Sequence, residues 1–273
     1  MDSGFERRAG IDIFVPGGGG DWRTALGKVT HLGIGAHADD LEFMAFAGIA
    51  ECRAGGGVFG GVTVTDGGGS VGGAGDLVAV RRAEQRQAAE MGGYGVMIQL
   101  GRSSEEARTP GALAADLGEI LALARPRIVY THNPADRHET HVALSSAVIE
   151  ALRKMEKARR PERVFGCEVW RDLDWMTDED RVRLDCGRDV EFAAKLNSVF
   201  RSQIEGGKRY DLAVMGRRRA QATFDDPRSA DAAAMVTLAM DLTPLIEDED
   251  LSLRDFVAAK IDRFREDVLR RLS

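Results

Sequence analysis

A polar stretch between two apolar segments near the N-terminus is the feature that most constrains the fold. Residues 29–36 are mostly apolar and include two glycines, which is typical of a buried parallel strand. Residues 37–42 bring one histidine and three carboxylates, and residues 43–52 return to an apolar helical pattern. Carboxylates are favoured in a first helical turn by the positive end of the helix dipole. The stretch therefore predicts a strand, a polar turn and a helix, with the polar side chains at the sheet edge where α/β proteins bind ligands.

The polar turn is open to three interpretations. His37 and Asp40 lie three residues apart and can both reach one metal ion, which leaves Asp39 free to act as a base. A plainer interpretation makes Asp39 only a helix N-cap and His37 a buried turn residue. Residues 33–38 also fit the G-x-G-x-x-A pattern of dinucleotide sites. We disfavour that interpretation, because a pyrophosphate on the helix N-terminus would be repelled by the carboxylates there.

The five histidines gather in two short stretches about a hundred residues apart, which histidines placed only for packing would not usually do. They are His31, His37, His132, His138 and His141. The second stretch follows an apolar segment at 127–131, as the first follows the apolar segment at 30–36. Two polar clusters that converge in the fold are a common way to build a metal site.

Apolar segments that alternate with helical patterns predict an α/β fold, with a mostly parallel sheet and helices on both faces. The predicted strands are 30–36, 58–65, 96–100, 127–131, 164–170 and 182–186. The predicted helices are 41–54, 76–92, 111–124, 141–158, 189–205, 228–239 and 253–271.

We predict a single domain over 1–273, because no linker or internal repeat interrupts the pattern. Residues 1–28 read as an irregular N-terminal arm with a short strand at 11–15, and 66–75 as a glycine-rich loop. The domain assignment is least certain for residues 206–273, where the sequence pattern gives the least information.

Composition narrows the class of partner. A net charge of −7 argues against nucleic acid as the main partner. No run is long enough to span a membrane, and the N-terminus lacks a basic-then-apolar signal. Three scattered cysteines are typical of reduced thiols. We expect a cytoplasmic protein whose partner is a small molecule, with self-association left open.

Two motifs carry a resemblance to a known family. Residues 36–42, Ala-His-Ala-Asp-Asp-Leu-Glu, resemble the A-H-P-D-D-x-E motif of the PIG-L/LmbE-like zinc-dependent N-deacetylases. Residues 138–141, His-Glu-Thr-His, resemble the family's second motif, H-P-D-H. Weaker similarities between about 30 and 205 are 65–67, Arg81 with Glu84, Asp185, Lys195 and the pair Ser202-Gln203.

The resemblance implies a Rossmann-like fold and removal of an N-acetyl group from a glucosamine-type sugar. By position, it implies that His37, Asp40 and His141 bind Zn2+, in a set that leaves one zinc position open for water. Asp39 would be the general base on that water, and His138 the general acid or oxyanion stabiliser.

Two residues depart from the family pattern. Ala38 replaces the usual proline, which costs some rigidity of the turn and little chemistry. Thr140 replaces the aspartate that in the family helps to set the charge of the active-site histidine. The second departure concerns the tuning of His138 rather than the metal site.

Several other polar residues have both a functional and a structural interpretation. Arg81 either binds substrate or pairs with Glu84 one turn along a helix. Asp136 either contacts the substrate and orients His138, or caps the next helix. For His132 we favour a loop residue over a fourth metal ligand.

Two larger features are expected to be structural. The triple arginine at 217–219 is expected on a solvated face, although it could border a pocket for an acidic substrate. The aromatic residues Trp170, Trp175 and Phe224 are expected in the core rather than as sugar platforms.

Two other functions compete with a zinc deacetylase. One is a metal-dependent hydrolase of another amide or ester. The other is a non-catalytic metal- or sugar-binding protein, which is considered because Thr140 is neutral where the family has an aspartate. The presence of Asp39 speaks against the latter, because a site that only binds has no use for that carboxylate.

Overall fold

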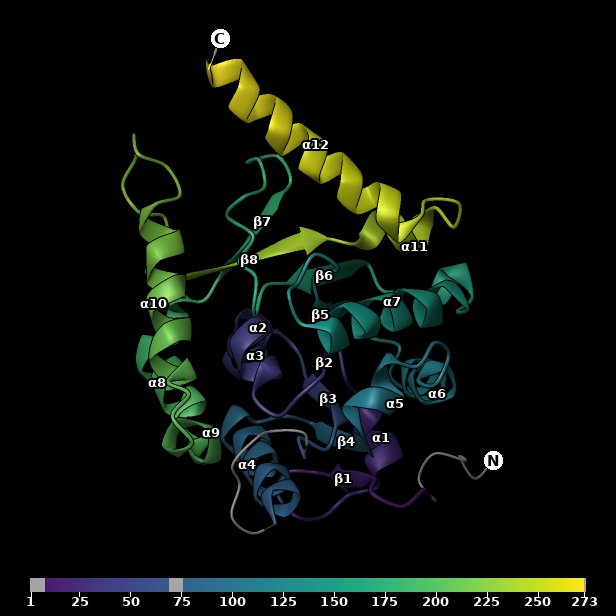
Figure 1. Ribbon diagram of the computed structural model, residues 1–273. Coiled ribbons are helices and arrows are strands. Elements are labelled where there is room, and N and C mark those ends of the chain that lie inside the picture. Colours follow the sequence, from purple (N-terminus) through teal and green to yellow (C-terminus); the bar gives the residue numbers. More distant parts are fainter. Residues whose placement is uncertain (1–7, 69–75, 273) are drawn as a thin grey trace.

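The computed structural model describes residues 8–68 and 76–272. Within these residues, eight strands form one sheet in the order β1-β4-β3-β2-β5-β6-β8-β7 (Figure 1). Strands β4, β3, β2, β5 and β6 run parallel, whereas β1 at one edge and β8 and β7 at the other pair antiparallel. The strands are β1 Asp12–Phe14, β2 His31–Gly35, β3 Phe59–Thr65, β4 Val96–Arg102, β5 Ile128–His132, β6 Arg163–Cys167, β7 Arg181–Asp185 and β8 Val236–Asp241. The predicted α/β class with a mostly parallel sheet is confirmed.

Helices cover both faces of the sheet (Figure 1). Two clusters of buried apolar side chains correspond to the two faces, one including residues of α1, α6, α7 and α11, the other residues of α2, α3, α4 and α8. The helices are α1 Trp22–Leu26, α2 Asp40–Met44, α3 Phe46–Glu51, α4 Leu77–Gly92, α5 Ser104–Arg108, α6 Ala114–Ala124, α7 Glu139–Arg153, α8 Val190–Asn197, α9 Arg201–Glu205, α10 Tyr210–Thr223, α11 Thr243–Glu247 and α12 Leu253–Leu272.

The glycines of β2 allow the first polar turn to pack closely on the sheet. A Cβ atom added at Gly35 would lie 2.9 Å from the Cβ of Asp40, and one at Gly33 would lie 2.8 Å from the ring of Phe59. Contacts this short do not occur between real side chains, so both positions need glycine. The glycine pattern is thus explained by the approach of α2 and β3 to β2, without a dinucleotide.

Several predicted elements are wrong. Residues 228–239 are not a helix, because 236–241 form β8, whose side chains are buried between β6 and β7. The predicted helix 189–205 is broken into α8 and α9. The N-terminal arm contains the helix α1, capped by Asp21, and is therefore not irregular throughout. Helices α5 and α10 were not predicted.

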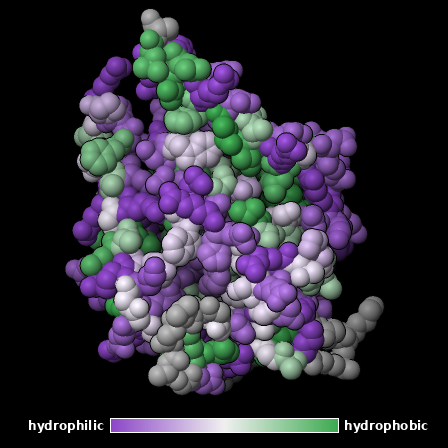
Figure 2. Space-filling view, in the orientation of Figure 1, coloured by the Kyte–Doolittle hydropathy of each residue, from purple (hydrophilic) through white to green (hydrophobic). Residues whose placement is uncertain are grey.

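Two further predictions concern the glycine-rich loop at 66–75 and the C-terminal helix. Residues 69–75 of the predicted glycine-rich loop lie outside the described residues. The predicted C-terminal helix is confirmed as α12. Its last turns expose apolar side chains, among them Phe264, Val268 and Leu272. Figure 2 shows hydrophobic surface at the top of the molecule, where Figure 1 places the C-terminal end of α12. In the described part of the chain, no helix combines the length and apolar character needed to span a membrane.

Candidate active site

The turn after β2 holds Asp39 in an unusual backbone conformation. Asp39 has φ 94° and ψ −27°, in the left-handed region that residues other than glycine seldom occupy. Its side chain makes no capping hydrogen bond to α2, although it stands at the N-cap position. The interpretation of Asp39 as only a helix cap is therefore wrong. Such a backbone costs on the order of 1–3 kcal/mol and persists only where neighbouring structure imposes it.

The fold brings the two histidine stretches together, because β2 and β5 are neighbouring parallel strands whose carboxyl ends meet at one sheet edge. Two groups of three side chains place possible ligand atoms within 4.8 Å of one another there. One is His37, His138 and His141, and the other is Asp40, His132 and His141.

The three predicted ligands form a compact triangle of atoms. Nδ1 of His37 lies 3.2 Å from Nε2 of His141 and 3.3 Å from Oδ2 of Asp40, and the last two atoms are 3.5 Å apart. Ligand atoms about 2.0–2.2 Å from a tetrahedral zinc lie about 3.3–3.5 Å from one another. The triangle thus has the dimensions of one face of a zinc tetrahedron, and the donor set is one that zinc accepts.

Asp136 fixes the orientation of His141. Its Oδ2 lies 3.2 Å from Nδ1 of His141, so a proton on Nδ1 is donated to the carboxylate and Nε2 keeps its lone pair for the triangle. Burial, followed by the nearby His132, lowers the pKa of His141 to about 4. The imidazole is therefore neutral near pH 7, as a metal ligand must be.

The structure differs from the predicted role of Asp136. The sequence predicts a substrate contact or an orienting partner for His138, but the carboxylate lies on His141 instead. It also accepts hydrogen bonds from the backbone N–H groups of Arg137, Trp170 and Arg171. The side chain of Asp136 is fully buried, and its oxygens contact protein groups rather than facing a substrate.

His132 is not a loop residue, which corrects a second expectation. It ends β5, is fully buried, and stacks on His141 with ring centroids 3.7 Å apart. Its Nε2 lies 3.2 Å from Oδ2 of Asp40 but also accepts the backbone N–H of Ala36 at 3.0 Å. Because that bond uses the nitrogen lone pair, His132 supports the triangle better than it would serve as a ligand.

Asp39 lies in a setting that suits a proton acceptor. Its side chain is almost fully buried, and burial, Asp40 and Glu42 together raise its pKa well above the usual value. Arg81 and a hydrogen bond from Gln203 act in the opposite direction. A carboxylate with a raised pKa is a better base near neutral pH than an exposed one.

His138 stands beside the triangle. Its ring centroid is 4.7 Å from that of His37 and 4.5 Å from that of His141. Burial, then the charge of His37, lowers its pKa, while Asp40 and Asp136 oppose the shift. Thr140 is fully buried, its Oγ1 has no hydrogen-bond partner among the described residues, and it adds no charge to help His138.

We expect Thr140→Asp to move the alkaline limb of the kcat/KM profile to higher pH. A nearby anion favours the protonated histidine, so the pKa of His138 rises and the acid form persists to higher pH. The measurement is a pH profile of both proteins on one substrate, with Thr140→Asn as the uncharged control. An unshifted limb in Thr140→Asp would mean that the charge of His138 does not limit the reaction.

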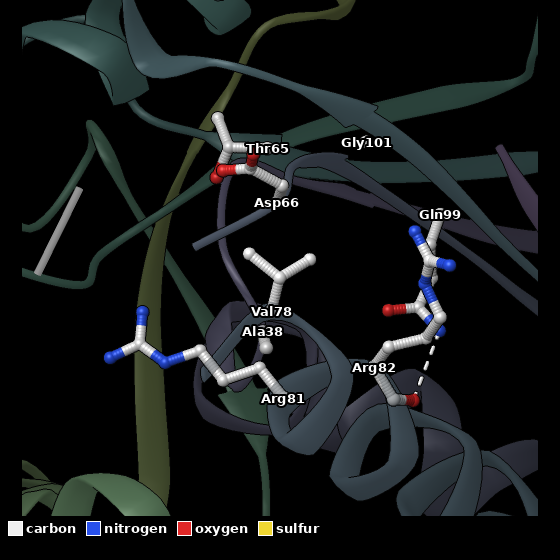
Figure 3. Close-up of a pocket in the computed structure, with 8 residues that line it drawn as sticks. All are labelled: Ala38, Thr65, Asp66, Val78, Arg81, Arg82, Gln99 and Gly101. Atoms are coloured by element: carbon white, nitrogen blue, oxygen red, sulfur yellow. Dashed lines mark hydrogen bonds between the residues drawn. The ribbon is translucent and has the colours of Figure 1, made fainter. Parts of the chain in front are cut away.

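Arg81 lines a small pocket next to the turn, with Ala38, Thr65 and Asp66 among its neighbours (Figure 3). Figure 3 shows Arg81 and Arg82 extending from α4 to opposite sides of Val78. Nη1 of Arg81 donates to the carbonyl of Gly67 at 2.8 Å, and its buried Nε has no hydrogen-bond partner among the described residues.

The predicted alternative for Arg81, a pair with Glu84, does not form. Both carboxylate oxygens of Glu84 instead accept hydrogen bonds from Ser202, one from its backbone N–H and one from its hydroxyl, each 2.7 Å long. These bonds tie α9 to α4 and bring Gln203 to the turn. Ser202 and Gln203 thus lie at the site, whereas Asp185 and Lys195 are exposed.

Three expectations about large side chains are wrong. Arg218 is not solvated but 1% exposed, and it donates to the backbone carbonyls of Glu42 and Phe43. Trp170 and Phe224 are not in the core, being 42% and 80% exposed. Sequence could not separate the three arginines at 217–219, because only the packing of α10 on β8 decides which one faces inward.

Comparison with known proteins supports the resemblance seen in the motifs. The model of a family described as PIG-L, GlcNAc-PI de-N-acetylase, matches residues 32–152. These residues include both histidine stretches. A search of curated proteins finds no match to this chain.

Solved structures share the fold at low sequence identity. GalB, the 4-carboxy-2-hydroxymuconate hydratase from Pseudomonas putida KT2440, superposes with a TM-score of 0.62 at 19% identity, covering 78% of this chain and 96% of its own. N,N'-diacetylchitobiose deacetylase from Pyrococcus horikoshii gives 0.61 at 18% identity, covering 80% and 85%. The A40926 pseudoaglycone deacetylase Dbv21 gives 0.58 at 15%, covering 78% and 97%. At such identities the likeness shows the fold alone. The match to the PIG-L family model therefore covers 32–152, the part of the chain that contains both histidine motifs.

Proposed function

We propose that this protein is a zinc-dependent hydrolase that removes an N-acetyl group from an amino sugar. The observation that carries the proposal is the triangle of His37, Asp40 and His141, which has the dimensions of a zinc face and adjoins the buried carboxylate of Asp39. The description of the matched family and the names of two deacetylases with this fold support the choice of reaction.

The chain's own residues can divide the work of amide hydrolysis. When bound, zinc would supply Lewis-acid activation of water and of the amide carbonyl. Asp39 accepts the proton that the attacking water loses, and the buried setting keeps this carboxylate basic. His138 stands where it can donate a hydrogen bond to the oxygen that becomes negatively charged. The amine leaves only after it is protonated, so Asp39 or His138 must return a proton.

Arg81 is the residue expected to bind a substrate hydroxyl or anionic group. We expect Arg81→Ala to raise KM more than it lowers kcat, because it removes binding made equally in the ground state and the transition state. Steady-state kinetics on the best substrate measure both constants. Arg86→Ala on the same helix is the matched control, because Arg86 does not line that pocket. Unchanged kinetics in Arg81→Ala would leave that side chain with only its structural bond to Gly67.

The proposal is tested by acetate detection across a panel of N-acetylated sugars. Protein stripped of metal by a chelator should release no acetate, and added zinc should restore release. Release that is equal with and without zinc would overturn the zinc dependence. Release from N-acetylated amino acids but from no sugar would place the substrate in another class of amide.

Hydration of a carbon–carbon double bond is a second candidate, because GalB, which has this fold, is named a hydratase. Loss of the ultraviolet absorbance of a conjugated enol acid, without acetate release from any sugar, would favour this candidate.

A further inference from the structure

Two aromatic side chains from separate segments form a pair beside His138. Trp170 follows β6, and its ring centroid is 6.2 Å from that of His138. Tyr210, the first residue of α10, meets the ring of Trp170 edge-on at 5.9 Å. Trp170 is 42% exposed although it adjoins a buried histidine cluster. Single exposed aromatics are common, but a pair at the edge of a polar site is not explained by packing alone.

Tyr210 connects this pair to the expected base. Burial and then the charge of Asp39 raise the pKa of the Tyr210 hydroxyl, and Arg81 opposes the shift. The ring of Tyr210 contacts that of Phe43 in α2, with ring centroids 6.1 Å apart, as well as that of Trp170. The aromatic pair therefore packs against the helix that directly follows Asp39.

A lysine adds positive charge to this wall. Nζ of Lys208 lies 5.9 Å from the centroid of the Trp170 ring, within the range of a cation–π contact. Lys208 is exposed, and across residues 8–68 and 76–272 no carboxylate pairs with it. The ammonium group is therefore available to a ligand that rests on the ring.

We propose that Trp170, Tyr210 and Lys208 form a subsite that stacks against a second sugar ring, next to the N-acetylated one, and favours an anionic substituent. The inference rests on the proposed function, because it assumes that the substrate is a sugar. Tryptophan offers a flat apolar surface to the apolar face of a pyranose, and a lysine beside it attracts phosphate or carboxylate.

Binding to the Asp39→Asn protein tests the subsite without turnover. N,N'-diacetylchitobiose should bind more tightly than N-acetylglucosamine, and Trp170→Ala should weaken the disaccharide about three- to tenfold while changing the monosaccharide little. Lys208→Gln should weaken N-acetylglucosamine 6-phosphate more than N-acetylglucosamine. Phe224→Ala and Lys154→Gln, exposed residues away from the site, are the matched controls.

Equal losses for one and two sugar rings in Trp170→Ala would overturn the stacking role. Equal losses for the phosphorylated and neutral sugars in Lys208→Gln would overturn the charge preference. If no sugar binds while the wild-type protein releases acetate from a compound that is not a sugar, the subsite fails and the hydrolase reaction stands. If no acetate is released from any compound, the proposed function fails independently.

A second inference comes from the hydrogen bonds around the turn. The peptide group between Ala38 and Asp39 is held at both ends by glutamine side chains. Its N–H donates to Oε1 of Gln85 at 3.2 Å, and its carbonyl accepts from Nε2 of Gln203 at 2.9 Å. This is the peptide that immediately precedes the left-handed backbone of Asp39.

A carboxylate holds Gln85 directly, and another holds the helix that carries Gln203. Nε2 of Gln85 donates to Glu42 at 2.9 Å, which leaves Oε1 to face the turn. Gln203 sits on α9, which Ser202 anchors to Glu84 of α4. The two glutamines come from helices that are far apart in sequence, so the clamp forms only in the folded chain.

We infer that Gln85 and Gln203 are positioning residues that impose the left-handed conformation of Asp39 and so aim its carboxylate. Glycine adopts this conformation without strain and alanine does not. In the wild-type background, Asp39→Gly should therefore melt about 2–4 °C above Asp39→Ala. In a Gln85→Met/Gln203→Met background the turn can relax, and this difference should shrink.

Thermal melting of the four proteins measures the effect without enzyme activity. With Asp39 intact, Gln203→Met should also lower kcat while KM and zinc content change little. Gln221→Met, which loses a hydrogen bond to Glu168 away from the turn, is the control. An equal Gly–Ala difference in both backgrounds would show that the glutamines do not impose the conformation, and would overturn the inference.

Discussion

Replacing Asp39 with asparagine is expected to lower kcat by roughly 10²-fold or more, the range found for a positioned general base. The amide keeps the size and hydrogen-bonding shape of the carboxylate but cannot accept the proton from water. Zinc content should stay near that of the wild-type protein, because the expected ligands are its neighbours. Steady-state kinetics and elemental analysis of the same preparation measure both quantities.

Asp262→Asn is a suitable control, because Asp262 is exposed on α12 and belongs to neither group of possible ligand atoms. It should leave kcat within a few-fold of wild type. Loss of metal in Asp39→Asn would make Asp39 a ligand and would contradict the division of roles between Asp39 and Asp40.

Replacing His141 with alanine is expected to remove zinc and reduce activity to background. His141 belongs to both groups of possible ligand atoms, so its loss leaves neither group with three donors. Asp136→Asn should act through His141 and weaken zinc binding by about 10- to 100-fold, because it removes the carboxylate that orients the imidazole. Metal content and a zinc titration with a competing chelator measure the two effects.

His31→Gln serves as the control for loss of a histidine. His31 is buried in β2, at the opposite end of that strand from the turn. The His31→Gln protein should therefore retain one zinc per chain. Full zinc occupancy in His141→Ala would refute the ligand assignment, and an unchanged zinc affinity in Asp136→Asn would show that His141 needs no orienting partner.

Local pattern was enough to predict the centre of the sheet. The parallel strands β2, β3, β4 and β5 are mostly apolar runs bounded by glycine, proline or polar residues. Such a run by itself predicts a strand that is buried on both faces. The expected convergence of His37 and His141 followed from the same pattern, because polar residues at the ends of neighbouring parallel strands share one edge. The periodic pattern of α12 likewise depended on no distant partner.

Pattern failed where distant contacts override local preference. Residues 236–241 form a strand because β6 and β7 supply hydrogen bonds on both sides, whereas the alanines just before them favour a helix. The burial of Arg218 depends on carbonyl groups of α2 that are more than 170 residues away in sequence. Neither set of contacts can be predicted from the residues next to it in the sequence.

By itself, the sequence determined the class of fold and the set of side chains from which a metal site can be built, since residue type and spacing carry that information. The tertiary structure alone decided how those side chains are used. It assigned Asp136 to His141 rather than to His138, stacked His132 beneath the cluster, and held Asp39 in a left-handed turn between two glutamines. These choices rest on hydrogen bonds and ring contacts between segments far apart in the chain, whose partners are defined only after the sheet has assembled.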